Sequence, residues 1–331
     1  MSAPIGICVI GGGAIAERHL QVYAQLGGVD PRWVVSQPAE AAADFARRWK
    51  FAHSGTAVEP ALGNTSVQLV LIASPSPLHS QQAVQALQAG KDVIVEIPVA
   101  LSWPDAQRVA DVAATLGRRV WVCHTLRSTP ALRLVRERVQ NGQLNLTQIA
   151  GFFGIPRRRN QGMGGIGTRT WIDNLLWHHG CHQVDAALWV LGITGVPGMP
   201  AIPRVQALLG PPHPQFGMAL DVGLQMVTAG GVLITQSLSY NVEHGVWRLQ
   251  FIGHEDVLTF QDGRLTNEAG EELVLETPTS DLTIQNRELL HAFRSGDSCE
   301  FDLPAALATM EVLGRAQACA ETGESSESLK R

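Results

Sequence analysis

A glycine-rich turn at residues 11–13 constrains the fold of this chain more than any other feature of its sequence. The turn follows a β-branched run, Ile5–Ile10, and directly precedes a helical pattern over Ala14–Leu26. Residues 11–16 fit the pattern G-x-G-x-x-A, whose glycines permit a tight turn and let a pyrophosphate approach a helix N-terminus. A glycine-rich turn is often only a turn, but its place between a strand and a helix favours dinucleotide binding. We therefore predict cofactor contacts from Gly11, Gly13, Ala14 and Ile15.

Strand-like and helix-like segments alternate through the first 125 residues. The predicted strands lie at 5–10, 29–36, 67–73, 92–96 and 119–123, and the predicted helices between them at 14–26, 39–49, 79–89 and 102–116. Ser102 and Asp105 form a pair typical of a capping box at the start of the last of these helices. Strands separated by helices form a parallel sheet with right-handed crossovers. This pattern predicts a Rossmann domain over residues 1–125.

The remaining residues, 126–331, have a different rhythm. We predict strands at 147–153, 204–209, 218–227, 232–240, 247–252 and 257–260, and helices at 130–141, 178–190, 281–294 and 304–319. Consecutive strands at hairpin spacing predict an α+β domain with a large, mostly antiparallel open sheet. Within residues 220–225 and 234–239 apolar side chains alternate with small polar ones, so one face should be covered by helices and the other should meet solvent or a wet, flat subunit interface. Residues 322–331 are expected to form a frayed polar tail.

Composition limits the kinds of protein this can be. Lys plus Arg total 25 against 30 Asp plus Glu, a formal net charge of −5, which argues against a general nucleic-acid binder. The 5 cysteines are widely spaced and contain no C-x-x-C, so neither a disulfide framework nor a structural zinc site is predicted. The longest strongly apolar runs have the length of strands, and the first residues lack the features of a leader. We therefore expect a cytoplasmic protein with no membrane partner.

The end of the second predicted strand bears on which cofactor binds. An acid there would accept a hydrogen bond from the 2′-hydroxyl of NAD and repel the 2′-phosphate of NADP. The chain instead has Ser36, Gln37 and Pro38, with no acid before Glu40, so NADP is favoured and NAD is the alternative. Glu96 ends a later strand, where such sheets bind ligands, and is expected to contact the nicotinamide riboside. The other predicted cofactor residues are Ser74, Pro75, His79 and Pro98.

Three further segments carry a family resemblance. Residues 92–98 read Asp-Val-Ile-Val-Glu-Ile-Pro, residues 122–130 read Val-Cys-His-Thr-Leu-Arg-Ser-Thr-Pro, and residues 177–185 read Trp-His-His-Gly-Cys-His-Gln-Val-Asp. With the glycine turn, these make the chain similar to the glucose–fructose oxidoreductase and inositol dehydrogenase family along essentially its whole length. The resemblance implies a Rossmann domain followed by an α/β domain whose open sheet often mediates oligomers, so a homo-oligomer is expected and a dimer favoured.

Two positions depart from the markers of that family, which are Glu-Lys-Pro and a helix reading Asp-x-Gly-x-His-x-x-Asp. Ile97 replaces the lysine and His178 replaces the first aspartate, whereas Gly180, His182 and Asp185 match. These departures, with the Leu-Leu-Trp-His-His run and the Phe-Phe pair before an arginine-rich loop, resemble the branch of 4-carboxy-2-hydroxymuconate-6-semialdehyde dehydrogenases. That branch oxidises the cyclic hemiacetal of the semialdehyde with NADP to 2-pyrone-4,6-dicarboxylate. The chain departs from it after the second strand, where Gln37 and Pro38 replace arginines.

The predicted catalytic residues lie on one helix. His178, His182 and Asp185 are spaced i, i+4, i+7 and share one face. His182 is the expected base, because an unperturbed imidazole pKa of about 6.5 lies close to working pH, and His178 is expected to orient it or to polarise the substrate. The i, i+4 pair also resembles half of a zinc site, but the Glu of H-E-x-x-H and a third ligand are missing, so no metal is predicted.

An arginine cluster indicates the substrate. No acid lies between Glu137 and Asp173, a stretch that holds several arginines, and arginine suits bidentate carboxylate recognition. A solvated basic loop, or contacts to cofactor phosphates, are the alternatives, but the loop directly precedes the histidine helix, which favours substrate carboxylates. We predict a small anionic substrate, bound by His124, Arg127, Arg158, Arg159, Arg169 and His179.

Three functions are consistent with the sequence. The first is the hemiacetal dehydrogenase, since a hemiacetal hydroxyl is more acidic than a simple alcohol and can manage without a lysine at position 97. The second is a dehydrogenase of a sugar, a cyclitol or another hydroxy acid. The third is a dinucleotide-binding regulator, which Ile97 favours and which the His182–Asp185 pattern disfavours.

Overall fold

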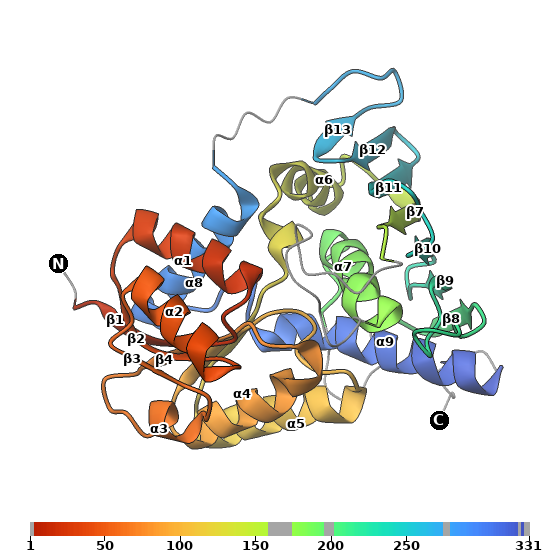
Figure 1. Cartoon of the computed structure of the whole chain (residues 1–331). Coiled ribbons are helices and arrows are strands. Elements are labelled where there is room, and N and C mark those ends of the chain that lie inside the picture. The colour runs from red at the N-terminus through yellow and green to blue at the C-terminus, as the bar shows by residue number, and fades with distance from the viewer. Residues whose placement is uncertain (1–2, 158–173, 195–201, 274–278, 324–325, 328–331) are drawn as a thin grey trace. The chain divides into compact units, whose positions relative to one another are not determined.

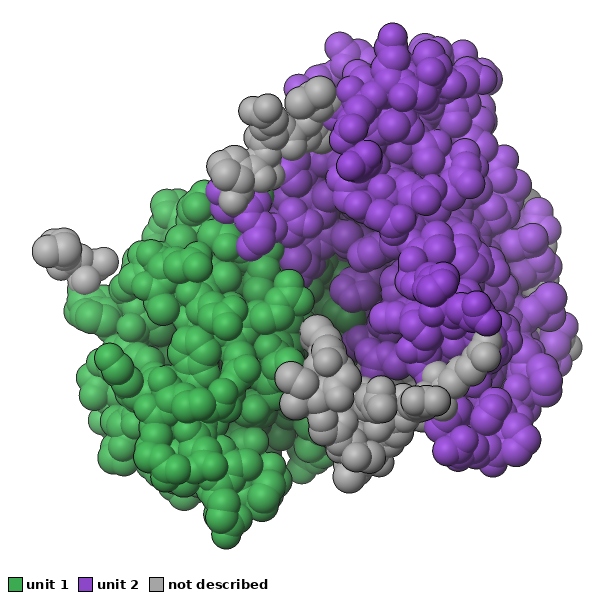
Figure 2. Space-filling view, turned by 45° about the horizontal axis from the view of Figure 1, so that its top comes forward, with its two compact units in different colours: residues 1–124, 282–303 green, residues 125–281, 304–331 purple. Residues whose placement is uncertain are grey.

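The computed structural model describes residues 3–157, 174–194, 202–273, 279–323 and 326–327. The chain divides into two compact units, drawn in different colours in Figure 2. The first unit contains residues 1–124 and 282–303, and the second contains residues 125–281 and 304–331. The first boundary thus lies one residue from the expected position. The expectation of a continuous second domain needs correction, because residues 282–303 return to the first unit.

The first unit is built on a six-stranded parallel sheet with the order β3-β2-β1-β4-β5-β6 (Figure 1). Strands β2 and β4 pair with opposite edges of β1, so the strand order reverses beside the glycine turn. Open α/β sheets bind ligands at such a switch point, outside the carboxyl ends of the strands. The strands are β1 (Ile5–Ile10), β2 (Val29–Val35), β3 (His53–Gly55), β4 (Leu69–Ile72), β5 (Asp92–Val95) and β6 (Val120–Val122). The predicted parallel sheet is confirmed.

Helices cover both faces of this sheet. They are α1 (Ala14–Leu26), α2 (Ala39–Trp49), α3 (Glu59–Leu62), η1 (Ser76–Leu78), α4 (His79–Gln88), α5 (Trp103–Leu116) and α8 (Asp281–Ser295). The late helix α8 joins this unit because its apolar side chains complete the core beside α1: Leu289 and Leu290 are buried with Leu20 and Tyr23. The sequence predicts that α8 is a helix from its apolar period. It does not predict which unit the helix packs against, because that depends on tertiary contacts.

The second unit is built on an eight-stranded sheet with the order β13-β12-β11-β7-β10-β9-β8-β14. Only the β7–β10 pair is parallel, so the prediction of a mostly antiparallel sheet is confirmed. The strands are β7 (Leu146–Gly154), β8 (Arg204–Leu209), β9 (Asp221–Val227), β10 (Leu233–Ser239), β11 (Val246–Gly253), β12 (Val257–Gln261), β13 (Arg264–Thr266) and β14 (Ser326–Glu327). The last strand pairs with the edge of β8, which corrects the expected frayed tail at these two residues.

The two faces of this sheet differ as the alternating side chains predict. On β9, Val222, Leu224 and Met226 are buried, whereas Asp221 and Gly223 are exposed. Helix α7 (Leu175–Val190) contacts β7, β9 and β10, and it is accompanied by η2 (Thr125–Ser128), α6 (Pro130–Gln140) and α9 (Leu303–Thr322). In the part of the chain that the structure describes, no helix is long and apolar enough to span a membrane.

Candidate active site

The glycine turn has a geometry that only glycine satisfies. Gly11 has φ +102°, and a Cβ there would lie 2.4 Å from the carbonyl oxygen of Ala73. Gly13 precedes the first turn of α1; within the described part of the chain no side chain caps this end, and a Cβ on Gly13 would meet nothing within 4 Å. The backbone N–H groups of the first turn of α1 are therefore open to a ligand with negative charge. This cradle fits the pyrophosphate of a dinucleotide, with Ala14 exposed and Ile15 half-buried in the same turn.

Ser36 lies beside this turn, at the end of β2. Its Oγ accepts a hydrogen bond from the Gly12 N–H at 3.2 Å, which leaves the hydroxyl proton to donate to another group. The next acid, Glu40, is exposed on α2. The Ser36 hydroxyl can donate a hydrogen bond, and no carboxylate lies between Ser36 and Glu40. This position is therefore compatible with a phosphate.

The loops after β4 and β5 are joined by His79. Its Nδ1 lies 2.8 Å from the carbonyl oxygen of Pro98 and its Nε2 lies 2.8 Å from that of Ser74. The ring is 1% exposed, so His79 holds the two loops together by backbone contacts. Pro98 is buried as well, and Pro75 is half-buried. Of these predicted cofactor residues, the geometry leaves Ser74 and Pro75 accessible.

Position 97, where the family marker has lysine, is part of the apolar interior. Ile97 is 3% exposed. A long cationic side chain at that position would need a charged partner or a route to solvent. A buried isoleucine thus stands where the marker has lysine, and proton transfer in this protein has to use other side chains.

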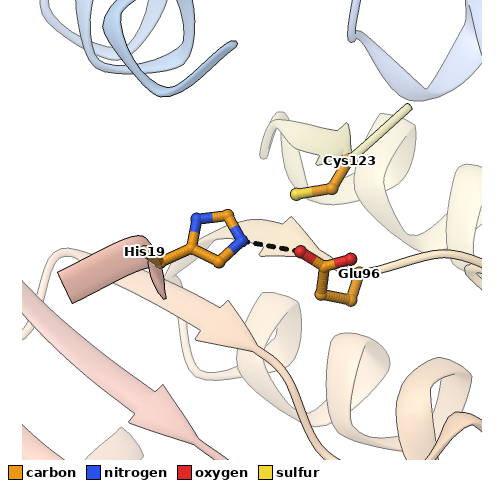
Figure 3. Close-up of side chains that lie close together, drawn as sticks. All are labelled: His19, Glu96 and Cys123. Atoms are coloured by element: carbon orange, nitrogen blue, oxygen red, sulfur yellow. Dashed lines mark hydrogen bonds and ion pairs between the residues drawn. The ribbon is translucent and has the colours of Figure 1, made fainter. Parts of the chain in front are cut away.

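Glu96, beside Ile97, belongs to a cluster with His19 and Cys123 (Figure 3). His19 Nε2 lies 2.6 Å from Glu96 Oε1. The other ring nitrogen, Nδ1, lies 2.9 Å from Asn286 Oδ1. The Asn286 side-chain amide donates to the carbonyl oxygen of Leu282 at 2.8 Å, which fixes its oxygen toward His19, so Nδ1 carries a proton and donates. Glu96 keeps 15% side-chain exposure, while His19 is fully buried.

The thiol of Cys123 is held in its protonated form. Burial raises the pKa of Cys123 well above its usual value, and the charge of Glu96 and a hydrogen bond to it raise that pKa further. Burial likewise raises the pKa of Tyr23, and electrostatic interactions with Cys123 and Glu96 raise that pKa further. Neither His19 nor Cys123 was predicted as a site residue from the sequence. One signal was available for His19: it lies between Ala16 and Leu20 on the apolar stripe of α1, where a polar side chain is unusual.

In the second unit, the predicted catalytic histidines occupy the one accessible part of α7. Asn174 caps the N-terminus of the helix, and its Oδ1 accepts a hydrogen bond from the Trp177 N–H at 3.2 Å. All its side chains are buried except those of His178 and His182, which are half-buried. The predicted shared face is confirmed for this pair, whose ring centroids are 6.3 Å apart.

Aromatic rings surround these histidines. His179 is 6% exposed and stacks on Phe153, with ring centroids 4.6 Å apart. The Tyr240 ring meets His179 edge-on at 5.4 Å, and the Trp247 ring lies 5.9 Å from that of His182. Neither Tyr240, the residue after β10, nor Trp247 of β11 was predicted from the sequence, because both lie more than 50 residues from the histidines they contact.

Asp185, expected on the same face, is engaged elsewhere. The Nε of Arg127 donates to Asp185 Oδ2 at 2.9 Å, and both side chains are 2% exposed. Arg127 also donates to the carbonyl oxygen of Ala305 at 3.0 Å, and the Thr309 hydroxyl lies 3.1 Å from Asp185 Oδ1. A guanidinium engaged in this way stabilises the fold, so this geometry argues against the predicted role of Arg127 in substrate binding.

The remaining predicted substrate residues divide into two groups. His124 is 1% exposed at the end of the first unit. Arg158, Arg159 and Arg169 lie outside the described residues.

A hollow of about 640 Å³ lies over the outer face of the eight-stranded sheet. Its lining includes Gln206, Leu208, Gln225, Thr235, Ser237 and Arg248.

Comparison with known proteins matches both units. The family described as "Oxidoreductase family, NAD-binding Rossmann fold" matches residues 5–124, and "Bacterial oxidoreductases, C-terminal" matches residues 130–273. A 4-carboxy-2-hydroxymuconate-6-semialdehyde dehydrogenase from Sphingobium sp. is 30% identical over 320 residues, which cover 93% of this chain and 96% of that relative. An inositol 2-dehydrogenase from Streptomyces avermitilis is 27% identical over 249 residues, covering 74% of this chain and 68% of the relative.

Among solved structures, levoglucosan dehydrogenase in complex with NADH has the same fold. Its TM-score is 0.84 at 17% sequence identity, covering 98% of this chain and 99% of the other. The chain therefore belongs to the glucose–fructose oxidoreductase and inositol dehydrogenase family, and it is a dehydrogenase with an NAD(P)-binding Rossmann fold rather than a non-catalytic regulator.

Proposed function

We propose that this protein oxidises the cyclic hemiacetal of 4-carboxy-2-hydroxymuconate-6-semialdehyde to 2-pyrone-4,6-dicarboxylate, with NADP as the hydride acceptor. The observation that carries this proposal is the exposure pattern of α7: in a helix that is otherwise buried, His178 and His182 alone are accessible. Imidazole is the side chain best suited to proton transfer near neutral pH. The name of the 30% identical relative supports the substrate.

In this mechanism His182 accepts the proton of the hemiacetal hydroxyl. The O–H bond breaks toward the imidazole, the C–H bond breaks with its electron pair, and the carbon–oxygen double bond of the lactone forms. A nicotinamide cofactor, when bound, would supply the acceptor for this hydride. His178, 6.3 Å from His182 between ring centroids, orients His182 or polarises the substrate. The rings of Phe153 and Trp247 meet edge-on with centroids 5.6 Å apart, and the Trp247 ring lies beside His182.

The buried Ile97 supports a hemiacetal over a simple alcohol. A cation next to the reacting oxygen stabilises an alkoxide, and an isoleucine cannot supply that charge. The hydroxyl of a hemiacetal is more acidic than that of an alcohol, so a neutral imidazole can take its proton without a neighbouring lysine. A cyclitol hydroxyl, which the inositol dehydrogenase relative suggests as the second candidate, lacks this advantage, and so does any hydroxyl of a sugar ring other than the anomeric one.

The test is a panel of substrates assayed with both cofactors. We expect NADP reduction with the muconate semialdehyde generated in situ, and little reduction with inositols or aldoses at equal concentration. Efficient turnover of an inositol or aldose without turnover of the semialdehyde would contradict the proposal. The arginines at 158, 159 and 169 supply a second readout, because each charge-assisted hydrogen bond to a substrate carboxylate is worth about 1.5–3 kcal/mol in KM.

We infer a preference for NADP from the end of β2. Ser36 has a hydroxyl proton to donate, and no carboxylate precedes Glu40 to reject a 2′-phosphate. Replacing Ser36→Asp should shift the ratio of kcat/KM values toward NAD, and Ser36→Ala is the matched control that removes the donor without adding charge. A wild-type protein that uses NAD clearly better than NADP would contradict this inference.

We also propose that the protein is a cytoplasmic homodimer. The outer face of the eight-stranded sheet supports the dimer: its hollow is lined by glutamine, threonine and serine, and Leu208 on it is 80% exposed. Five free thiols support a reducing compartment. Sedimentation of the wild type and of Leu208→Asp tests the dimer, which the added charge should dissociate; a monomeric wild type would contradict it.

A further inference from the structure

We propose that His19, Glu96 and Cys123 form a binding site for a single thiophilic divalent cation of the zinc type. In the part of the chain that the structure describes, this is the one group of three or more His, Cys, Asp or Glu side chains whose potential ligand atoms all lie within 4.8 Å of one another. Figure 3 shows the three side chains pointing toward one another. They come from α1, from the residue after β5 and from the residue after β6.

The donor set selects the metal. An imidazole nitrogen, a carboxylate oxygen and a sulfur match zinc and cobalt, whereas magnesium and calcium prefer oxygen ligands alone. With metal–ligand bonds of about 2.0–2.3 Å, tetrahedral ligand atoms lie about 3.3–3.8 Å apart. His19 Nε2 and Glu96 Oε1 start 2.6 Å apart, so they need only separate slightly, and the sulfur needs only to approach.

The group behind His19 already has the arrangement that a metal-bound histidine requires. A ligating imidazole normally donates its other N–H to a fixed acceptor, which sets the tautomer and the ring orientation. Here His19 Nδ1 donates to Asn286 Oδ1 at 2.9 Å, and Asn286 is itself fixed by the carbonyl oxygen of Leu282. Nε2 is therefore the nitrogen directed at Glu96 and available to a cation.

The charges balance when a cation replaces two protons. The 2.6 Å distance between His19 Nε2 and Glu96 Oε1 places one proton between these two atoms, and the neutral thiol of Cys123 carries a second. A divalent cation would bind neutral His19, the Glu96 carboxylate and the Cys123 thiolate, and both protons would pass to the buffer. The buried site thus stays neutral overall, which avoids the cost of an unpaired buried charge.

Entry to the site is through Glu96, which keeps 15% side-chain exposure while His19 has none. Glu96 lies at the carboxyl edge of the parallel sheet, where we expect the nicotinamide riboside. If that expectation holds, the cation and the dinucleotide compete for one carboxylate. This consequence rests on the proposed function, whereas the cation site itself does not.

The experiment is a titration of the reduced, chelator-treated full chain with Co²⁺, followed by the thiolate-to-cobalt charge-transfer absorption. We expect one equivalent to bind with this band, and Mg²⁺ to produce none and to leave the titration unchanged. Cys123→Ser should abolish the band, and Glu96→Gln and His19→Gln should each weaken binding at least tenfold. Cys299→Ser, which removes another thiol of the same unit beside Asp302, is the matched control and should leave the titration intact.

Circular dichroism of each variant separates loss of a ligand from loss of the fold. Calorimetry of Zn²⁺ binding in two buffers of different ionisation enthalpy should give two protons released per cation. A charge-transfer band that persists in Cys123→Ser, or that disappears in Cys299→Ser, would overturn the proposal. Adding NADPH to the cobalt-loaded protein tests the contact of Glu96 with the cofactor separately. If Co²⁺ binds and NADPH does not displace it, the metal site stands and the proposed contact between Glu96 and the cofactor is wrong.

Discussion

The glycine turn of the first unit and the histidine helix of the second reach their functional geometry by different routes. At the turn, the decisive facts are local: Gly11 has φ +102°, and its missing Cβ lets the chain pass the carbonyl of Ala73. On α7, the decisive fact is burial by partners distant in sequence, which leaves only His178 and His182 accessible. The residues of the turn specify its geometry by themselves. On α7, the residues that pack around the helix decide which of its side chains remain accessible for chemistry.

The difference also appears in how each region tolerates its polar groups. Backbone N–H groups at the start of α1 face outward and need only a ligand. Along α7 a charge is buried instead, and Asp185 requires Arg127 from 58 residues away. Substitutions in the two regions should therefore fail in different ways, one through backbone strain and the other through lost chemistry or an unpaired charge.

The largest effect is expected at the histidines. His182→Ala should lower kcat by roughly 10²–10⁴, the usual contribution of a general base, and should leave dinucleotide affinity nearly unchanged. The control is His254→Ala, which removes an exposed imidazole of the same unit and should leave kcat unaltered. Steady-state kinetics with cofactor titrations measure both. Near-normal turnover in the His182 variant would make the helix histidines structural and direct attention to His179 and His124.

A second substitution asks whether Arg127 binds substrate or stabilises the fold. Arg127→Leu leaves Asp185 buried without its cation, so the free energy of unfolding should fall by about 3–5 kcal/mol. The double variant with Asp185→Leu should recover most of that loss, because the unpaired charge is gone as well. Urea unfolding measures both variants. A raised KM with unchanged stability would instead return Arg127 to the substrate site.

A third comparison separates strain from ligand binding within the glycine turn. Gly11→Ala forces a side chain into φ +102° and against Ala73, so unfolding free energy should fall by about 1–3 kcal/mol. Gly13→Ala meets nothing within 4 Å, so stability should hold while the added methyl group weakens dinucleotide binding. Thermal unfolding and fluorescence titration with NADPH distinguish the two. If both substitutions lowered the free energy of unfolding equally, the strain at the turn would not be specific to Gly11.

The effect with the narrowest range of conditions concerns the core of the first unit, and it is confined to alkaline pH. Burial raises the pKa of Cys8 from 9.0 to about 12, so the folded protein keeps this thiol protonated while the unfolded chain loses the proton above pH 9. The contribution of Cys8 to the free energy of unfolding is fully present below pH 9. It is lost as the pH rises toward 12, by up to about 1.4 kcal/mol per pH unit. Cys8→Ala should flatten the fall in unfolding free energy between pH 9 and 10.5. An unchanged slope would contradict this account.

Much of the fold could be predicted because its signals are periodic and local. Ser102 caps α5 as its spacing with Asp105 predicts, with Oγ accepting from the Asp105 N–H at 3.2 Å. The short elements β3, α3 and β13 could not be predicted, since three or four residues carry no period. The candidate site was predicted where residues lie on one element, as for His178 and His182. It was missed where residues meet from several elements, as for Trp247 and Cys123.

The sequence by itself determined the glycine turn, the alternation of strands and helices, and the shared face of His178 and His182. Each depends on backbone sterics or side-chain period within about one or two turns of chain. Only the tertiary structure decided that α8 returns to the first unit, that Asp185 pairs with Arg127, and that Glu96 meets His19 and Cys123. Such contacts join residues up to 267 positions apart, as for His19 and Asn286, because burial in a common core brings them together and no local rule encodes the pairing.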